Sequence, residues 1–510
     1  MKLLDGRGWR GDERLEAEVV IIGSGPAGAA VARAAASAGA DVLVLEEGPM
    51  PQPAETSSDS FGAMSSLYRD MGVGVTRGKP AMALLQGRAV GGTSVVNGAI
   101  SWRLPEDVFD GWRREDPALA EALPWEWIEA ATDEVEAGLH ITPTDPAVAG
   151  RNNTLLARGA EALGLAHRPI RRNVRDCEGL GRCLQGCPVG AKQSLERTWL
   201  PEACERGARV AASVRVERIE TAQGRAVGVT GRAEGGARVS VRATHAVVLA
   251  ASAVQSPALL LASGIRQGPV GRHFQCHPGV AVAGRFGEPV RMWTGATQGH
   301  EVTGLRGEGL KFEALGYDLT ILAARLRGFG VDFARELERM HEAAHWGCAV
   351  RAESEGRVVL RRGRPVVRFD LGRGDLFKVR RGVRVLGELL FAAGAEQVEP
   401  GVFGMPSVVT GAEQMRAFED DGPLLGTHYS MAVTHLFGTC RMGSDPATSV
   451  VRPDFRHHHI EGLYVADSSV FPSNTGVNPQ TSILALATLC GRQLTSSRAP
   501  DPPRARPPSG

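Results

Sequence analysis

Residues 17–48 carry the pattern that most constrains how this chain can fold. A short apolar run at 19–22 precedes Gly23, Gly25 and Gly28, which open an Ala-rich stretch; a second apolar run at 42–45 ends in Glu46. Short runs rich in β-branched residues are typical of buried parallel strands. The order of strand, glycine triad, helix, strand and acid predicts a βαβ unit that binds a dinucleotide.

The residues of this unit have separate expected roles. Gly23 permits a tight turn, Gly25 lets the backbone approach a pyrophosphate, and Gly28 lets the helix pack closely on the strand. The helix N-terminus offers free N–H groups and partial positive charge to phosphates. Glu46 is placed to accept hydrogen bonds from ribose hydroxyls. Its charge would repel a 2′-phosphate, which disfavours NADP and leaves FAD and NAD open.

Composition narrows the class of protein. A chain of 510 residues that is 43% hydrophobic predicts two or more domains with sizeable cores. The net charge of +1 gives no field that would attract nucleic acid. We expect no transmembrane segment and no secretory signal, because no apolar stretch is long enough. Eight cysteines are too few for a disulfide scaffold, which predicts a cytoplasmic protein. The Pro-rich tail at 497–510 is expected to be disordered.

The remaining segments alternate between the two domains. Residues 207–260 contain sheet-like runs, and the alternating segment 356–371 predicts half-exposed antiparallel strands, followed by a helix at 375–393. Near the end, a buried strand at 463–466 leads to Asp467, and an apolar helix is expected at 481–494.

These segments together resemble the glucose–methanol–choline (GMC) family of FAD-dependent oxidoreductases. The resemblance covers nearly the whole chain in the family's order. It rests on the motifs IIGSGPAGA with Glu46, GRAVGGTSVVNG, VVLAASAVQSPALLLASGI, VGRHFQCHPG, HLFGTCRMG and LYVADSSVFPSNTGVNPQTSILALA. Cholesterol oxidase-like and long-chain alcohol oxidase-like members are the most similar, through GVNP and CLQGCPVGAKQS.

The resemblance implies an α/β fold made of two domains. A Rossmann-like FAD-binding domain with a parallel sheet is expected to comprise residues 15–105, 170–285 and 425–496. A substrate-binding or cap domain, built on a mainly antiparallel sheet with helices, is expected to comprise residues 106–169 and 286–424.

The resemblance also identifies FAD as the dinucleotide. Covalently flavinylated relatives have a His just before the Asn of the loop beside the isoalloxazine, and here that position is Val96. We therefore predict a non-covalent FAD. The residues carried over to FAD binding are Gly23, Gly25, Pro26, Ala27, Gly28, Glu46, Gly92, Thr93, Asn97, Gly98, Val214 and Asp467.

The family's two catalytic positions correspond to His435 and Asn478. An imidazole with a pKa near neutrality can accept the hydroxyl proton of an alcohol as general base. The Asn478 amide can orient the hydroxyl and donate to developing negative charge, while FAD accepts the hydride at N5. The expected reaction oxidises a small-molecule alcohol, with a preference for an apolar one, and passes the electrons to oxygen or another acceptor.

Two alternatives remain open from the sequence. Some relatives keep FAD but act as lyases without net redox chemistry. Cys177, Cys183 and Cys187 are spaced like iron–sulfur ligands, which would suit a sugar or alcohol dehydrogenase subunit. We favour a structural loop for these cysteines. The run of three histidines at 457–459 has no matching carboxylate cluster, and no metal site is predicted.

Overall fold

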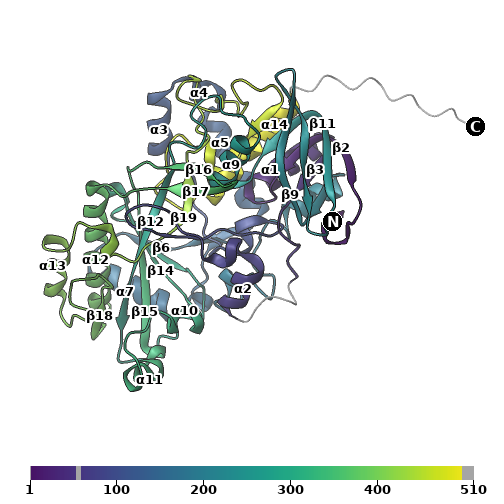
Figure 1. The fold of residues 1–510 in the computed structure, drawn as a ribbon. Coiled ribbons are helices and arrows are strands. Elements are labelled where there is room, and N and C mark those ends of the chain that lie inside the picture. The colour runs from purple at the N-terminus through teal and green to yellow at the C-terminus, as the bar shows by residue number, and fades with distance from the viewer. Residues whose placement is uncertain (1, 53–58, 497–510) are drawn as a thin grey trace, which may run out of the picture.

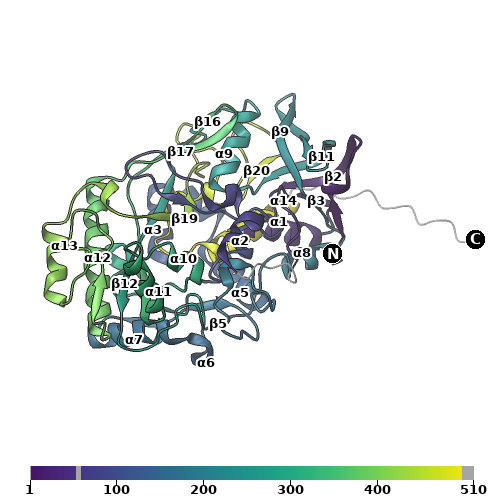
Figure 2. The ribbon, with the colours of Figure 1, turned by 60° about the horizontal axis from the view of Figure 1, so that its bottom comes forward.

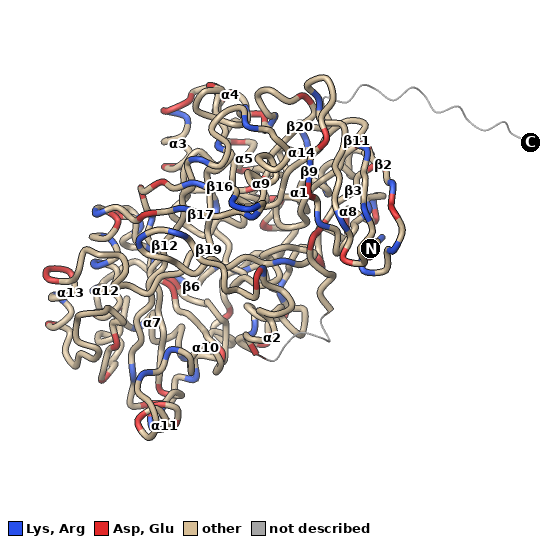
Figure 3. The backbone as a smooth tube through the Cα atoms, viewed as in Figure 1, with Lys and Arg blue, Asp and Glu red and all other residues tan. Residues whose placement is uncertain are grey.

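The computed structural model describes residues 2–52 and 59–496, so the tail predicted to be disordered lies outside the described residues. Figure 1 shows two lobes, each built around one of two large sheets. Lys, Arg, Asp and Glu are interspersed over both lobes (Figure 3). Among the helices that the structure describes, none combines the length and apolar character needed to cross a membrane.

The first sheet has the strand order β1-β8-β3-β2-β11-β10-β9, with β20 paired to β11. Its parallel part consists of β1 (Leu3–Asp5), β8 (Arg209–Ala212), β3 (Val42–Leu45), β2 (Glu13–Ile22), β11 (Arg238–Leu249) and β20 (Leu463–Val465). The strands β10 (Arg225–Ala233) and β9 (Val214–Ala222) continue it in antiparallel pairing.

The predicted βαβ unit is present in this sheet. Strand β2 ends at Ile22, α1 (Pro26–Ser37) follows, and β3 pairs in parallel with β2. Eight of the twelve residues of α1 are buried, most of them alanines, because the helix packs between the sheet region and α14 (Gln480–Ser496). Small side chains on α1 allow this close packing.

The second sheet has the order β4-β19-β12-β15-β14-β13-β6, with β18 also paired to β12. All its pairs are antiparallel except that of β4 with β19. The helices α12 (Arg373–Ala392) and α7 (Arg151–Ala162) pack against it (Figure 2). Its strands are β4 (Ala83–Leu84), β19 (Ala432–Phe437), β12 (Gln275–Arg285), β15 (Ala343–Val350), β14 (Leu310–Ala314), β13 (His300–Val302), β6 (His167–Pro169) and β18 (Gln397–Glu399).

The parallel sheet and the mainly antiparallel sheet confirm the predicted fold class. The alternating segment forms the hairpin of β16 (Arg357–Arg361) and β17 (Arg364–Arg368), whose arginines at both ends are exposed. The other elements are α2 (Ser60–Leu67), α3 (Glu106–Glu115), α4 (Ala118–Ala122), α5 (Trp125–Gly138), α6 (Pro146–Ala149), α8 (Trp199–Glu205), α9 (Ser252–Ala262), α10 (Leu319–Ala323), α11 (Val331–Glu338), α13 (Arg416–Asp420), β5 (Ile141–Pro143) and β7 (Arg171–Asn173).

The division into two discontinuous domains stays a prediction. The strands β12 and β19, which that division assigns to the FAD-binding domain, form hydrogen bonds within the second sheet. Helix α5, which it assigns to the substrate domain, packs against α14 on the side of the first sheet. Both sheets therefore contribute to the region where the two lobes meet.

Candidate active site

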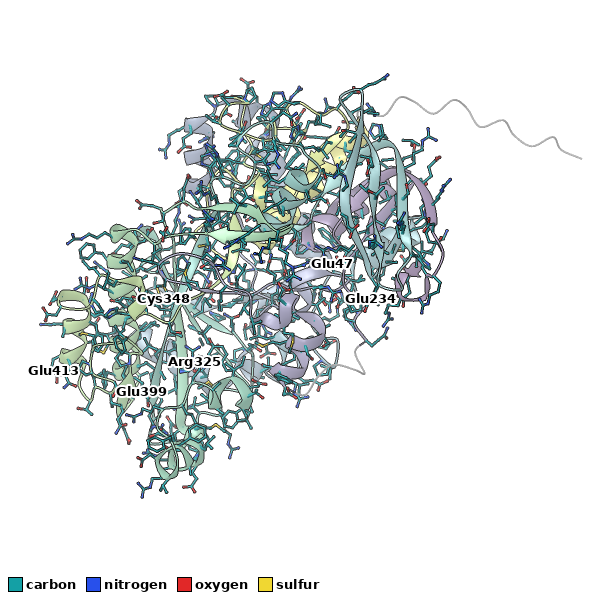
Figure 4. All side chains as sticks on the ribbon, in the orientation of Figure 1. Glu47, Glu234, Arg325, Cys348, Glu399 and Glu413 are labelled. Atoms are coloured by element: carbon teal, nitrogen blue, oxygen red, sulfur yellow. The ribbon has the colours of Figure 1, made fainter. Side chains whose placement is uncertain are left out.

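A continuous cavity of about 780 Å³ lies between the two sheets. Its nucleotide side is formed where β2, β3, β11 and β20 end, which is where open parallel sheets bind ligands. Its other side is lined by strands β12, β15 and β19 of the second sheet. Figure 4 labels Glu47 on the nucleotide side and Cys348 on the side of the second sheet, and both residues line the cavity.

The structure brings nearly all the predicted site residues to this one cavity. Only Gly28 does not line it, because this glycine is buried between helix and strand, where a Cβ would lie 1.9 Å from the carbonyl oxygen of Gly23. The predicted residues in the lining are Gly23, Gly25, Pro26, Ala27, Glu46, Gly92, Thr93, Asn97, Gly98, Val214, His435, Asp467 and Asn478.

Two glycine loops, one with Gly23 and Gly25 and one with Gly92, line the nucleotide side of the cavity. Gly23 has a φ of +97°, a left-handed conformation that glycine adopts without strain. A Cβ on Gly92 would lie 2.6 Å from the Cα of Gly25, so the loops meet with no room for a side chain. Pro26 occupies the first turn of α1, where its missing N–H costs nothing. Backbone N–H groups can therefore approach a phosphate closely.

Two buried carboxylates lie beside these loops. Glu46 accepts hydrogen bonds from the backbone N–H (3.0 Å) and hydroxyl (2.7 Å) of Ser24, and from the N–H of Gly48 (2.8 Å). Asp467 accepts from the N–H of Ser252 (3.0 Å) and the N–H of Ser469 (2.8 Å). Burial raises the pKa of both carboxyls, against these hydrogen bonds.

A buried lysine holds the loop that is predicted to lie beside the isoalloxazine. Lys192 is 1% exposed, and its ammonium donates to the carbonyl oxygens of Val95, Asn97 (3.0 Å) and Cys183 (2.7 Å). The Asn97 amide donates to the Gln480 side chain at the start of α14. Lys192 and Gln480 were not predicted as site residues, because Val95 and Asn97 are distant from them in the chain.

The proposed catalytic pair meets at the cavity. His435 lies on β19, Asn478 lies just before α14, and the Nδ2 of Asn478 is 3.5 Å from the Nε2 of His435. The pairing of β12 with β19 is irregular between Cys276 and Pro278, because β19 has one extra residue at this point, a β-bulge. This irregularity places the Nδ1 of His277 3.1 Å from the Nδ1 of His435.

His277 connects His435 to a second polar chain. Its Nε2 lies 3.2 Å from Oδ1 of Asn474, and the N–H of Gly476 points to the same nitrogen at 3.0 Å. The Asn474 amide donates to the Ala352 carbonyl (2.7 Å), which leaves its Oδ1 as the end that faces His277. The CHPG motif contains His277, but the motif alone predicted no role for this residue.

The expectation of a near-neutral pKa for His435 is wrong in this structure. Burial, and then the positive charge of Lys311, lower the pKa of His435 to about 3. Burial and His435 lower the pKa of His277 well below its usual range. Both imidazoles are therefore neutral at physiological pH, so one nitrogen of each ring carries a free lone pair.

The loop that contains the three cysteines lies next to buried cationic side chains. Arg172 is 1% exposed, and its guanidinium lies 3.2 Å from Sγ of Cys183 and 3.9 Å from Sγ of Cys177. The positive charges of Arg172 and Lys192 lower the pKa of the Cys183 thiol, although burial opposes them. Within the described ranges, no three His, Cys, Asp or Glu side chains are grouped to hold a metal ion.

Comparison with known proteins defines the class to which this fold and site belong. Two models described as GMC oxidoreductase match residues 64–279 and 352–487. The chain is 37% identical over 483 residues to an uncharacterized GMC-type oxidoreductase of Mycobacterium tuberculosis, covering 94% of this chain and 76% of the relative. The chain belongs to the GMC oxidoreductase family, as its motifs predicted.

More distant relatives extend this result. Long-chain-alcohol oxidase FAO4B of Arabidopsis thaliana is 28% identical over 522 residues, covering 95% of this chain and 68% of that protein. The crystal structure of pyridoxine 4-oxidase from Mesorbium loti shares the fold with a TM-score of 0.71 at 19% identity, covering 95% of this chain and 100% of that chain.

The protein is a FAD-binding flavoprotein, and its residues fit this cofactor. The cavity has a volume within the range of cofactor sites, roughly 300–1,000 Å³. The glycine loops offer backbone N–H groups for the pyrophosphate, and Glu46 retains acceptor capacity for ribose hydroxyls beyond its three protein donors. The loop with Asn97 and the pair His435–Asn478 line the same cavity.

We expect Glu46→Ala to weaken FAD binding at least about tenfold, because the buried donors of Ser24 and Gly48 lose their acceptor. Titration of the apoprotein with FAD, followed by flavin fluorescence, measures the dissociation constant. Asp41→Ala is the matched control, since Asp41 precedes β3 as Glu46 follows it and pairs with Arg209 away from the cavity. Equal FAD affinity in Glu46→Ala and wild type would contradict the role of Glu46.

We expect His435 of the apoprotein to show no titration between about pH 5 and pH 8. Histidine NMR signals, with that of His435 assigned by its loss in His435→Asn, make the measurement. The unfolded chain takes up this proton near pH 6.5, so acidification below that value lowers stability by way of His435. A midpoint near neutrality would show that burial and Lys311 do not control this imidazole.

Proposed function

We propose that this protein oxidises the CH–OH group of a small alcohol to a carbonyl. The observation that supports this most directly is that His435 and Asn478 line the same cavity as the two glycine loops. The Nδ2 of Asn478 lies 3.5 Å from the Nε2 of His435. FAD, when bound, supplies the hydride acceptor. The non-covalent attachment predicted from Val96 is part of the proposal.

The protein side chains then have defined tasks. The hydroxyl of the substrate lies against Nε2 of His435, which takes the hydroxyl proton as general base; such assistance is typically worth roughly 10²–10⁴-fold. The Nδ2 group of Asn478 donates to the same oxygen and stabilises its developing negative charge. As the proton leaves the oxygen, the hydride leaves the carbon, and a C=O bond forms.

The lining of the cavity on the side of the second sheet supports an apolar substrate. Val280, Leu315 and Met431 contribute apolar side chains there, and the polar residues Glu313 and Arg325 also line the cavity. The similarity to a long-chain-alcohol oxidase agrees with this preference. We propose an apolar primary or secondary alcohol as the substrate class, with oxygen or another acceptor for the electrons.

We expect His435→Ala to slow anaerobic flavin reduction by roughly 10²-fold or more, because the variant lacks the imidazole that accepts the hydroxyl proton. Stopped-flow loss of the oxidised flavin absorbance, with fatty alcohols, sterols, sugars and choline as substrates, makes the measurement. FAD content equal to that of wild type is the control.

Two results would overturn the proposal. Unchanged reduction in His435→Ala would exclude this residue as the base. A wild-type flavin that no alcohol reduces, but that accompanies non-redox conversion of a substrate, would favour a lyase.

A further inference from the structure

Lys311 is a fully buried lysine that the proposed chemistry does not use directly. It lies on β14, is 1% exposed, and does not itself line the cavity. Its ammonium contacts two carboxylates, Glu301 at 2.8 Å and Glu313, which are 0% and 8% exposed. The same ammonium donates to Oδ1 of Asn478 at 2.8 Å.

Both carboxylates that contact Lys311 also accept hydrogen bonds from other side chains. Glu301 accepts from the indole N–H of Trp102 at 2.7 Å and pairs with Arg168 at 2.8 Å. Glu313 accepts from the amide of Gln298 at 2.8 Å. Two cations and two carboxylates therefore balance in charge. Burying such a cluster costs desolvation energy that its internal attraction barely offsets, so stability alone gives a weak reason for it.

The bond from Lys311 decides which way the Asn478 amide faces. An ammonium can only donate, so it must meet the carbonyl end of the amide. The amide nitrogen is then the end that faces Nε2 of His435, at 3.5 Å. Without this bond, a rotation of the amide by 180° would present its oxygen to the cavity, and a donor would become an acceptor.

We propose that Lys311 is a positioning residue that holds the NH₂ group of Asn478 toward the substrate oxygen. This inference rests on the proposed function, in which Asn478 donates to the developing oxyanion. The amide nitrogen can bond to Nε2 of His435 only where that nitrogen has its lone pair. The fixed amide therefore also favours the imidazole form that accepts a proton at the cavity.

A charge-matched variant tests this role. Lys311→Met alone would leave buried carboxylates unpaired, whereas Lys311→Met with Glu313→Gln retains the Glu301–Arg168 pair. We expect this double variant to reduce its flavin at least about tenfold more slowly with 1-dodecanol, or with the most active alcohol of the screen, while the alcohol concentration at half-maximal rate changes little.

A double-mutant cycle shows whether Lys311 acts through Asn478. We expect Asn478→Ala to slow reduction as well, and the Lys311→Met/Glu313→Gln changes to add less than about twofold in the Asn478→Ala background. Fully additive effects would overturn the inference, because Lys311 would then act independently of the amide. A wild-type rate in the Lys311→Met/Glu313→Gln variant would also overturn it.

The amide itself gives a readout that does not depend on catalysis. The chain has only six asparagines, so selective ¹⁵N-asparagine labelling gives six side-chain amide signals, and loss in Asn478→Ala assigns one of them. We expect the Asn478 signal to shift in Lys311→Met/Glu313→Gln. An unshifted Asn478 signal would overturn the inference about Lys311, whether or not the enzyme is active. Failure of every alcohol to reduce the wild-type flavin would contradict only the proposed function.

Arg285→Met is the matched control for breaking a buried ion cluster. Arg285 is 5% exposed and is the last residue of β12, at the end of the strand away from His277. It contacts Glu336 and lies 4.0 Å from Glu399. We expect this variant to lower the unfolding temperature while the flavin reduction rate stays within about twofold of wild type and the Asn478 signal does not move. Equal loss of rate in Arg285→Met would assign the Lys311 effect to general destabilisation.

Discussion

The parallel pairing of β2 with β3 on one side and β11 on the other is the constraint on which the site depends. Strand β11 pairs in turn with β20, which lies more than 400 residues after β2 in the chain. Because parallel strands end at the same edge, the turn at Gly23, the carboxylate of Glu46 and that of Asp467 meet there. The same pairing brings the segment that contains Asn478 to the nucleotide loops.

The second sheet completes the site through the alignment of its strands, which brings side chains from different strands together. The irregular pairing of β12 with β19 at Pro278 sets His277 against His435, and β14 carries Lys311 to the back of Asn478. The polar chain from Asn474 through the two imidazoles and Asn478 to Lys311 joins four separate segments. A small slip of β14 would therefore disturb the orientation of the amide, and a slip of β12 would disturb the histidine contact.

The sequence predicted the parts of the site that local pattern determines. The run at 42–45 is strand β3 with the predicted bounds, and the glycine spacing located both the turn and the helix packing at Gly28. Lys311 could not be found this way, because its partner Asn478 lies 167 residues away and only strand pairing brings them together. The prediction of a near-neutral pKa for His435 was wrong for the same reason. Burial and the charge of Lys311, which is distant only in the sequence, lower this pKa.

In the proposed reaction, the charges around the cavity would make proton transfer and hydride transfer favour one another. A proton accepted by His435 adds positive charge to a buried site that already faces Lys311, and this is costly while nothing compensates it. Transfer of the hydride from the substrate to bound FAD would leave negative charge on the cofactor, near the protonated imidazole, and would lower this cost. If Asn478 donates to the oxygen throughout, as proposed, the alkoxide would not need to form fully before the hydride leaves. A neutral imidazole with a low pKa is therefore compatible with its proposed role as the base, because the proton becomes stable on His435 only as the oxidation proceeds.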